Sequence, residues 1–169
     1  MRTLTMLAVL LVLAGCQTVS KGPSASAKLD AAKGGRVVGT VMFQEADGRT
    51  TVRAEVNGLA PNRQFGFHVH EKGDCSAADF TSAGGHFNPE GKPHGDHKSA
   101  SSHAGDLPNL SSDSQGVAVL SYTTPLLTVA PGPNSVVGRA VVVHENPDDY
   151  RSQPAGNSGP RIACGVIKG

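Results

Sequence analysis

The chain has 169 residues, with 15 Lys or Arg against 14 Asp or Glu, so its formal net charge is +1. This balance argues against a nucleic-acid-binding protein, which needs a basic surface. Hydrophobic residues make up 38% of the chain, which excludes a disordered protein, and 21 Gly with 11 Pro exclude a helical bundle. No apolar run is long enough for a membrane span. We expect one soluble, loop-rich β domain.

The N-terminus has the pattern of an export signal. Arg2 precedes a largely apolar stretch over residues 4–13, which ends in Leu-Ala-Gly-Cys at residues 13–16. This order is typical of a secretory signal peptide over residues 1–15. The last four residues resemble the lipobox of bacterial lipoproteins, which implies a lipid on Cys16 and anchoring in the membrane. Gln17 then favours the outer membrane, facing the periplasm. An ordinary signal peptide with a chance cysteine is the alternative.

Two cysteines remain once Cys16 is assigned to the lipid. Cys75 and Cys164 would lie in an exported, oxidising compartment, so the simplest prediction is one disulfide between them. It would close a loop of about 90 residues and stabilise the fold by roughly 4–5 kcal/mol. Two buried free thiols are the alternative.

Residues 16–34 are small, polar and dotted with lysine, and they show no periodic apolar face. We predict that they form a flexible tether and that the folded domain covers residues 35–169.

Short β-branched runs bounded by turn residues follow the tether. They predict strands within residues 36–44, 50–59, 64–70, 117–122, 136–144 and 161–167. Ala46-Asp47-Gly48 predicts a hairpin between the first two. No segment has a helical period, so the fold class is all-β, an antiparallel sandwich or flattened barrel. Residues 71–116 and 145–160 are long loops, which in a compact domain are usually functional.

Three of the seven histidines fall on predicted strands. His68 and His70 are two residues apart, so both project from one face of their strand, opposite Phe67 and Val69. His144 ends another strand. Taken alone, each would be read as a surface residue or a strand terminus.

The first long loop changes that interpretation. His86, His94, His103 and Asp106 lie in a glycine-rich segment with no core of its own, and a metal ion could organise it. Three imidazoles and a carboxylate would complete a closed tetrahedral zinc site. Three imidazoles on strands with one from the loop would suit copper. The number of imidazoles requires that two metals share one ring.

Five segments carry a family resemblance. They are GFHVH at 66–70, GHFNP at 85–89, HAGDL at 103–107, VHE at 143–145 and GPRIACGVI at 159–167. In order and spacing they resemble the motifs of the copper/zinc superoxide dismutases, over about residues 36–168. The resemblance implies a Greek-key β-sandwich and the disproportionation of superoxide to dioxygen and hydrogen peroxide.

The same resemblance implies the role of each site residue. Copper would be held by His68, His70, His86 and His144, and zinc by His86, His94, His103 and Asp106, with His86 as the bridge. Arg161 would hold the superoxide anion beside copper. Asp148 would accept hydrogen bonds from His68 and His94. Cys75 and Cys164 match the family disulfide.

Two features depart from the family pattern. His97 matches no ligand, so we interpret it as a solvated loop residue, with an auxiliary metal contact as the alternative. The loop 145–160 is short and contains no lysine. Steering of superoxide would then depend on Arg161, the metals, and Lys72 or Lys92, or would be weaker.

The function expected is protection of the cell envelope from extracytoplasmic superoxide. A copper-buffering envelope lipoprotein on the same scaffold is the main alternative, followed by a copper-only dismutase and a purely structural sandwich. The sequence leaves open whether the protein is a homodimer.

Overall fold

A computed structural model of the protein describes residues 22–169. The predicted signal peptide 1–15 and Cys16 lie outside the described residues. Within them the structure is all-β, with one 3-10 turn at Thr81–Ala83, and no helix could cross a membrane. The strands are β1 Ser24–Ala31, β2 Val38–Ala46, β3 Arg49–Asn57, β4 Gln64–Phe65, β5 Phe67–His70, β6 Leu110–Ser111, β7 Ala118–Thr124, β8 Ala140–His144 and β9 Arg161–Val166. All six predicted runs contain a strand.

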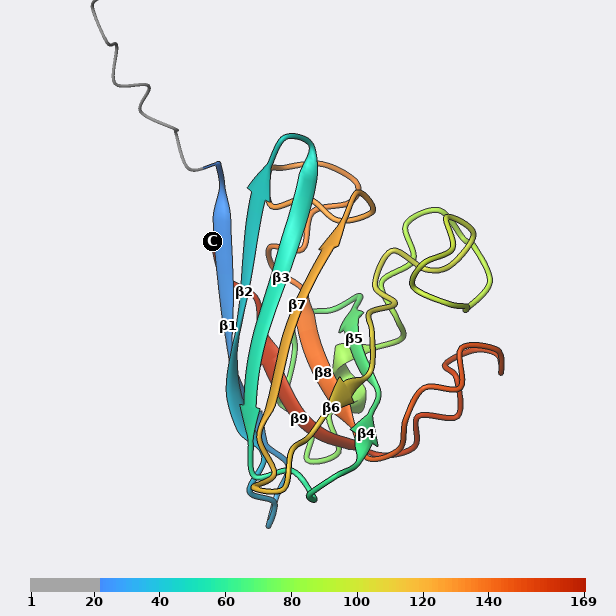
Figure 1. The fold of residues 1–169 in the computed structure, drawn as a ribbon. Helices are drawn as coiled ribbons and strands as arrows, with labels where there is room; N and C mark the ends of the chain where they lie inside the picture. Colours follow the sequence, from blue (N-terminus) through green and yellow to red (C-terminus); the bar gives the residue numbers. More distant parts are fainter. Residues whose placement is uncertain (1–21) are drawn as a thin grey trace, which may run out of the picture.

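Seven strands form one antiparallel sheet that curls into a sandwich. Their order is β5-β8-β9-β1-β2-β3-β7, and β4 pairs separately with β6. β3 lies beside β7 and β5 lies beside β8, although other strands separate the members of each pair in the sequence, and this gives the crossed connections of a Greek key. The two long loops lie on the same side of the sandwich, next to β5 and β8 (Figure 1). The predicted fold class is confirmed.

The tether prediction was wrong for residues 24–31, which form β1. Ala25, Ala27 and Leu29 are buried while the residues between them are exposed, so the segment alternates with the period of a strand. β1 pairs with β2 from Ser24 to Leu29 and with β9 at Asp30 and Ala31, joining the two halves of the sheet. The folded domain therefore begins before residue 35.

The hairpin between β2 and β3 follows the sequence prediction. Ala46 pairs with Arg49, leaving a two-residue turn of Asp47 and Gly48 with φ angles of 51° and 70°. Positive φ at both positions matches the twist of antiparallel strands, and Asp-Gly adopts it at low cost.

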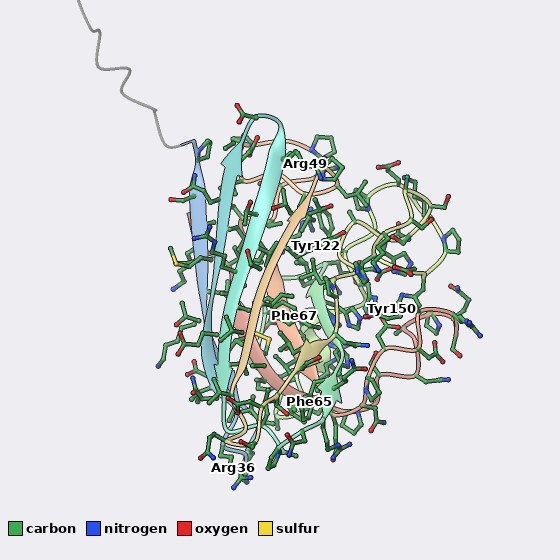
Figure 2. The ribbon with its side chains drawn as sticks, viewed as in Figure 1. Arg36, Arg49, Phe65, Phe67, Tyr122 and Tyr150 are labelled. Atoms are coloured by element: carbon green, nitrogen blue, oxygen red, sulfur yellow. A yellow bond between two sulfur atoms is a disulfide. The ribbon has the colours of Figure 1, made fainter. Side chains whose placement is uncertain are left out.

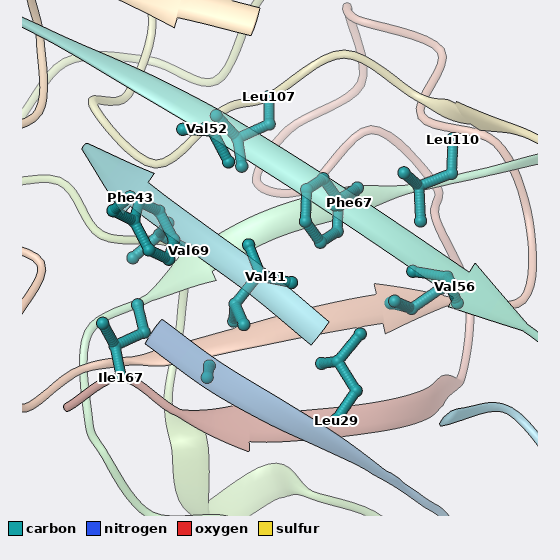
Figure 3. Packing of buried hydrophobic residues seen from close by; sticks show 14 of the residues in the cluster. Leu29, Val41, Phe43, Val52, Val56, Phe67, Val69, Leu107, Leu110 and Ile167 are labelled. Carbon is teal, nitrogen blue, oxygen red and sulfur yellow. The ribbon is translucent and has the colours of Figure 1, made fainter. Parts of the chain in front are cut away.

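Aliphatic and phenylalanine side chains fill the sandwich, among them Phe43, Val52, Phe67, Leu107 and Ile167 (Figure 3). A smaller cluster lies on the opposite face of β8, where Val142 and Cys164 pack against Phe80. β8 is therefore buried on both faces, which explains its unbroken apolar sequence.

The Cys75–Cys164 disulfide is formed, across a sequence separation of 89 residues. It ties the first long loop to β9 beside the smaller cluster, as predicted. The loop that carries four of the seven histidines is thereby fixed to the sheet.

Candidate metal centre

β5 divides its side chains between two environments. Phe67 and Val69 enter the sandwich, and His68 and His70 project from the other face. The two histidines are nonetheless buried, with 0% and 1% exposure, because the long loops cover this face. The prediction that the pair shares one face of the strand, opposite Phe67 and Val69, is confirmed, and the loops make it an interior site.

The first loop runs back alongside β5. His70 is bridged to His86, and His68 to Asp106, in antiparallel fashion. Backbone bonds from Phe87 N to Val69 O and from Val69 N to Gly105 O hold these segments together. The loop therefore places its own histidines next to those of the strand.

Two groups of potential ligands result among the described residues. One consists of His68, His70, His86 and His144, and the other of His86, His94, His103 and Asp106. All members are buried, and within each group one ligand atom per residue lies within 4.8 Å of the others. The structure thus brings together every metal ligand predicted from the sequence, with His86 in both groups.

Hydrogen bonds determine which nitrogen of each ring in the first group is free. His70 Nδ1 donates to Gly84 O at 2.9 Å and His144 Nδ1 donates to Gly159 O at 3.1 Å. Their Nε2 atoms therefore carry lone pairs, and these two atoms lie only 3.3 Å apart. His68 donates from Nε2 to Asp148 Oδ2 at 2.8 Å, so its buried Nδ1 has the lone pair and has no partner.

Asp106 Oδ1 is the centre of the second group. It lies 2.9, 3.1 and 3.3 Å from Nδ1 of His86, His94 and His103. The first two contacts are hydrogen bonds, whereas Nδ1 of His103 has none. The other oxygen, Oδ2, accepts from the backbone N–H groups of Gly95 and His103. Three imidazoles and one carboxylate are a donor set that zinc prefers.

Asp148 links the two groups. Its Oδ2 accepts from His68 and its Oδ1 accepts from His94 Nε2 at 2.9 Å. Asn109 fixes the backbone of Asp148 through two further hydrogen bonds. The predicted carboxylate between the two sites is present, with the predicted partners.

Burial and neighbouring charges set the protonation of the rings. Burial lowers the pKa of His68 to about 3 and that of His144 to about 4, and it lowers the pKa of His70 and His86 as well. His94 differs, because its hydrogen bonds to Asp106 and Asp148 outweigh burial and raise its pKa to about 9. The rings of the first group are therefore neutral, and in the second group a protonated His94 is paired with the carboxylates of Asp106 and Asp148.

Arg161 is held beside the first group. Its Nη1 and Nη2 each donate a 2.6 Å hydrogen bond, to Phe80 O and Gly84 O. Its charge is close enough to help lower the pKa of His70 and of His144. A guanidinium has five N–H groups, so three remain for an anion.

The residues outside the family pattern lie outside both groups. The His97 ring is 5.3 Å from those of Tyr122 on β7 and Tyr150 in the second loop, both labelled in Figure 2. Its side chain is only 10% exposed, so the solvated interpretation was wrong and His97 is a packing residue. Lys92 forms a 2.7 Å ion pair with Glu90, which weakens it as a steering charge.

The fit of metals to these residues follows from the free lone pairs. His68 Nδ1, His86 Nε2 and His103 Nδ1 are buried without a hydrogen-bond partner, and such atoms carry a cost that a cation would remove. A nitrogen-only set suits copper and a set of three imidazoles with a carboxylate suits zinc.

Comparison with known families agrees with this chemistry. The profile of the family described as copper/zinc superoxide dismutase matches residues 37–167. The chain belongs to the copper/zinc superoxide dismutase family. It is therefore a superoxide dismutase with copper and zinc as its cofactors.

Curated relatives share this name. Superoxide dismutase [Cu-Zn] 2 of Aquifex aeolicus is 42% identical over 138 residues, covering 79% of this chain and 81% of the relative. Superoxide dismutase [Cu-Zn] 2 of Brassica juncea is 46% identical over 138 residues, covering 78% and 89%.

Solved structures share the fold of this superoxide dismutase. The clock protein EA4 has a TM-score of 0.78 and 37% identity, over 90% of this chain and 98% of that one. A double mutant of a SOD-like protein from Bacillus subtilis has a TM-score of 0.77 and 38% identity, over 85% and 97%.

One site residue that sequence reasoning missed is Gly156. Its φ is +65°, and a Cβ there would collide with the Asp148 carboxylate and lie 2.8 Å from His94 Nε2. Only glycine leaves room for this contact. The sequence gives no signal for it, because the collision depends on how the second loop folds over the first.

Proposed function

We propose that the first group holds copper, that the second holds zinc, and that His86 bridges them. The observation that carries this proposal is the convergence of four unprotonated nitrogens, His68 Nδ1 and the Nε2 atoms of His70, His86 and His144. His86 faces Asp106 through Nδ1 and leaves Nε2 free and buried. One ring therefore presents a nitrogen to each group.

The activity of the family is the disproportionation of two superoxide anions and two protons to dioxygen and hydrogen peroxide. Copper, when bound, supplies the alternating one-electron oxidation and reduction, and zinc supplies a fixed positive charge. Arg161 binds each superoxide by charge and hydrogen bonds, and the carbonyls of Phe80 and Gly84 fix the orientation of its guanidinium. His86 Nε2 takes up a proton in one half of the cycle and delivers it to the nascent peroxide in the other; water supplies the second proton.

The second group has a positioning role in this scheme. Asp148 fixes the rings of His68 and His94 by accepting hydrogen bonds from their Nε2 atoms, and so fixes the position of one group relative to the other. Fixed ligands and dipoles stabilise a reacting charge without reorganisation.

Substitution of a ligand used by copper alone tests the assignment. We expect His144→Ala to keep the fold and zinc, to lose copper, and to lose nearly all dismutation measured by pulse radiolysis. His97→Ala is the matched control, since His97 belongs to neither group and should keep both metals and activity. Normal dismutation by His144→Ala would contradict the copper assignment.

We propose further that the protein is exported, anchored by a lipid on Cys16 in the outer membrane, and protects the cell envelope from superoxide. The Cys75–Cys164 disulfide supports an oxidising compartment. Labelled fatty acid should be incorporated into the full chain and not into Cys16→Ala, which should also leave the membrane fraction. Incorporation into both would contradict the anchor.

A further inference from the structure

Arg139 immediately precedes β8 and lies outside both groups of ligands. Its guanidinium contacts three separate segments. Nε donates to Ser135 O at 2.9 Å, Nη1 donates to Glu71 O at 2.7 Å, and Cζ lies 3.7 Å above the centre of the Phe87 ring. The last distance is that of a close cation–π contact.

The positions of these partners in the chain are informative. Glu71 directly follows His70, and Phe87 directly follows His86. The side chain of Arg139 therefore contacts both the residue that follows His70 and the residue that follows His86. His70 and His86 are themselves bridged to each other.

Hydrogen bonds connect the residues that Arg139 contacts to the backbone on either side of His86. Glu71 N donates to Gly85 O at 2.9 Å, and Glu71 Oε1 accepts from Gly85 N at 3.3 Å, so Glu71 fixes the residue before His86. Phe87 is 2% exposed and its backbone bonds to Val69 and Gly105 on either side. His86 therefore lies between Gly85, which is bonded to Glu71, and Phe87, which is in contact with Arg139.

We propose that Arg139 is a positioning residue that fixes the separation of His70 and His86, and hence the geometry of the copper site. The inference rests on the proposed assignment of copper to this group. The contacts need a planar cation that donates hydrogen bonds in its own plane while its face stacks on an aromatic ring. The guanidinium of arginine can do both, and the ammonium of lysine cannot. None of the three residues that Arg139 contacts directly precedes or follows His94, His103 or Asp106 in the sequence, so zinc depends on Arg139 less.

The test compares Arg139→Gln and Arg139→Lys with the wild-type protein, and uses Arg53→Gln, an exposed arginine on β3, as control. Copper and zinc affinities are measured by chelator competition, and the copper environment by electron paramagnetic resonance. We expect copper affinity to fall about 10–100-fold in both variants, with an altered copper spectrum, a much smaller loss of zinc, and no effect in Arg53→Gln.

Each other outcome has a definite meaning. Unchanged copper affinity and spectrum in both variants would overturn the proposal while leaving the copper site intact. A parallel loss of both metals and of thermal stability, with an unchanged spectrum for the residual copper, would make Arg139 merely structural and also overturn it. A wild-type protein that binds no copper would overturn the assignment of the group itself.

Discussion

The carboxylate of Asp148 receives one ring N–H on each oxygen, from His68 and from His94. Each of these bonds leaves the opposite nitrogen of its ring directed at a metal group. An asparagine has one acceptor oxygen, and its NH₂ group would face an N–H donor. The residue therefore controls the tautomers of two rings in two different sites.

We predict that Asp148→Asn lowers zinc affinity about 10–100-fold, as is usual when a partner of a ligating histidine is lost. Copper affinity should fall as well, since His68 loses the same support. Chelator competition measures both constants. Asp149→Asn is the control, because that exposed carboxylate contacts Ser152 and Asn157 and no histidine. Equal metal affinities in Asp148→Asn and the wild type would contradict the linking role.

Gly156 is a second residue whose effect is local and steric. We predict that Gly156→Ala displaces the Asp148 carboxylate and lowers zinc retention, measured as metal per chain after dialysis against a chelator. Gly91→Ala separates this effect from backbone strain, because Gly91 has the same φ of +65° with open space around it. The control should cost about 1–2 kcal/mol of stability and keep its zinc. Loss of zinc from both variants would favour strain as the cause.

β1 shows where prediction from the sequence stops. Its buried positions are two alanines and one leucine, a weak apolar signal between serines and a lysine. β2 buries Val41 and Phe43 and β3 buries Val52 and Val56, and these strongly apolar residues predict both strands from the sequence. β1 is a strand because β2 and β9 offer edges on both sides of it, and such pairing is not encoded in the segment itself.

The residues of the metal site also divide into those that the sequence predicts and those that it does not. Strand alternation alone predicts that His68 and His70 share a face, and this is confirmed. The composition of the first loop predicts a metal site of His86, His94, His103 and Asp106. That His86 is the loop histidine which joins the strand histidines follows from the family resemblance, because loop residues have no periodicity from which to predict contacts. Arg139 over Phe87 and Gly156 against Asp148 depend on tertiary contacts alone.

We predict that Leu29→Ala lowers the free energy of unfolding by about 2–5 kcal/mol, the usual cost of a buried cavity, because Leu29 is fully buried in the main cluster. Urea unfolding of the metal-free protein measures it. Lys28→Ala changes the neighbouring side chain, which is 81% exposed, and should stay within about 0.5 kcal/mol of the wild type. Equal effects of the two substitutions would mean that residues 24–31 act as a tether after all.

The metal ligands are divided between the strands of the sandwich and the first long loop. His68, His70 and His144 belong to β5 and β8, whereas His86, His94, His103 and Asp106 belong to the first loop. The second loop supplies Asp148. A metal that binds these groups therefore holds both loops against the sheet, and its binding free energy adds to the stability of the whole fold.

We predict that zinc loading alone raises the melting temperature of the protein. Free zinc at a thousand times its dissociation constant contributes about 4 kcal/mol, and for a chain of this size each kcal/mol corresponds to about 2–4 °C. The expected rise is therefore about 8–16 °C by calorimetry. His103→Ala removes one ligand that lies outside the sandwich, so the metal-free variant should melt near the metal-free wild type and gain much less from zinc. The same rise in His103→Ala would mean that zinc binds elsewhere in the molecule, and the second group of ligands would then not be its site.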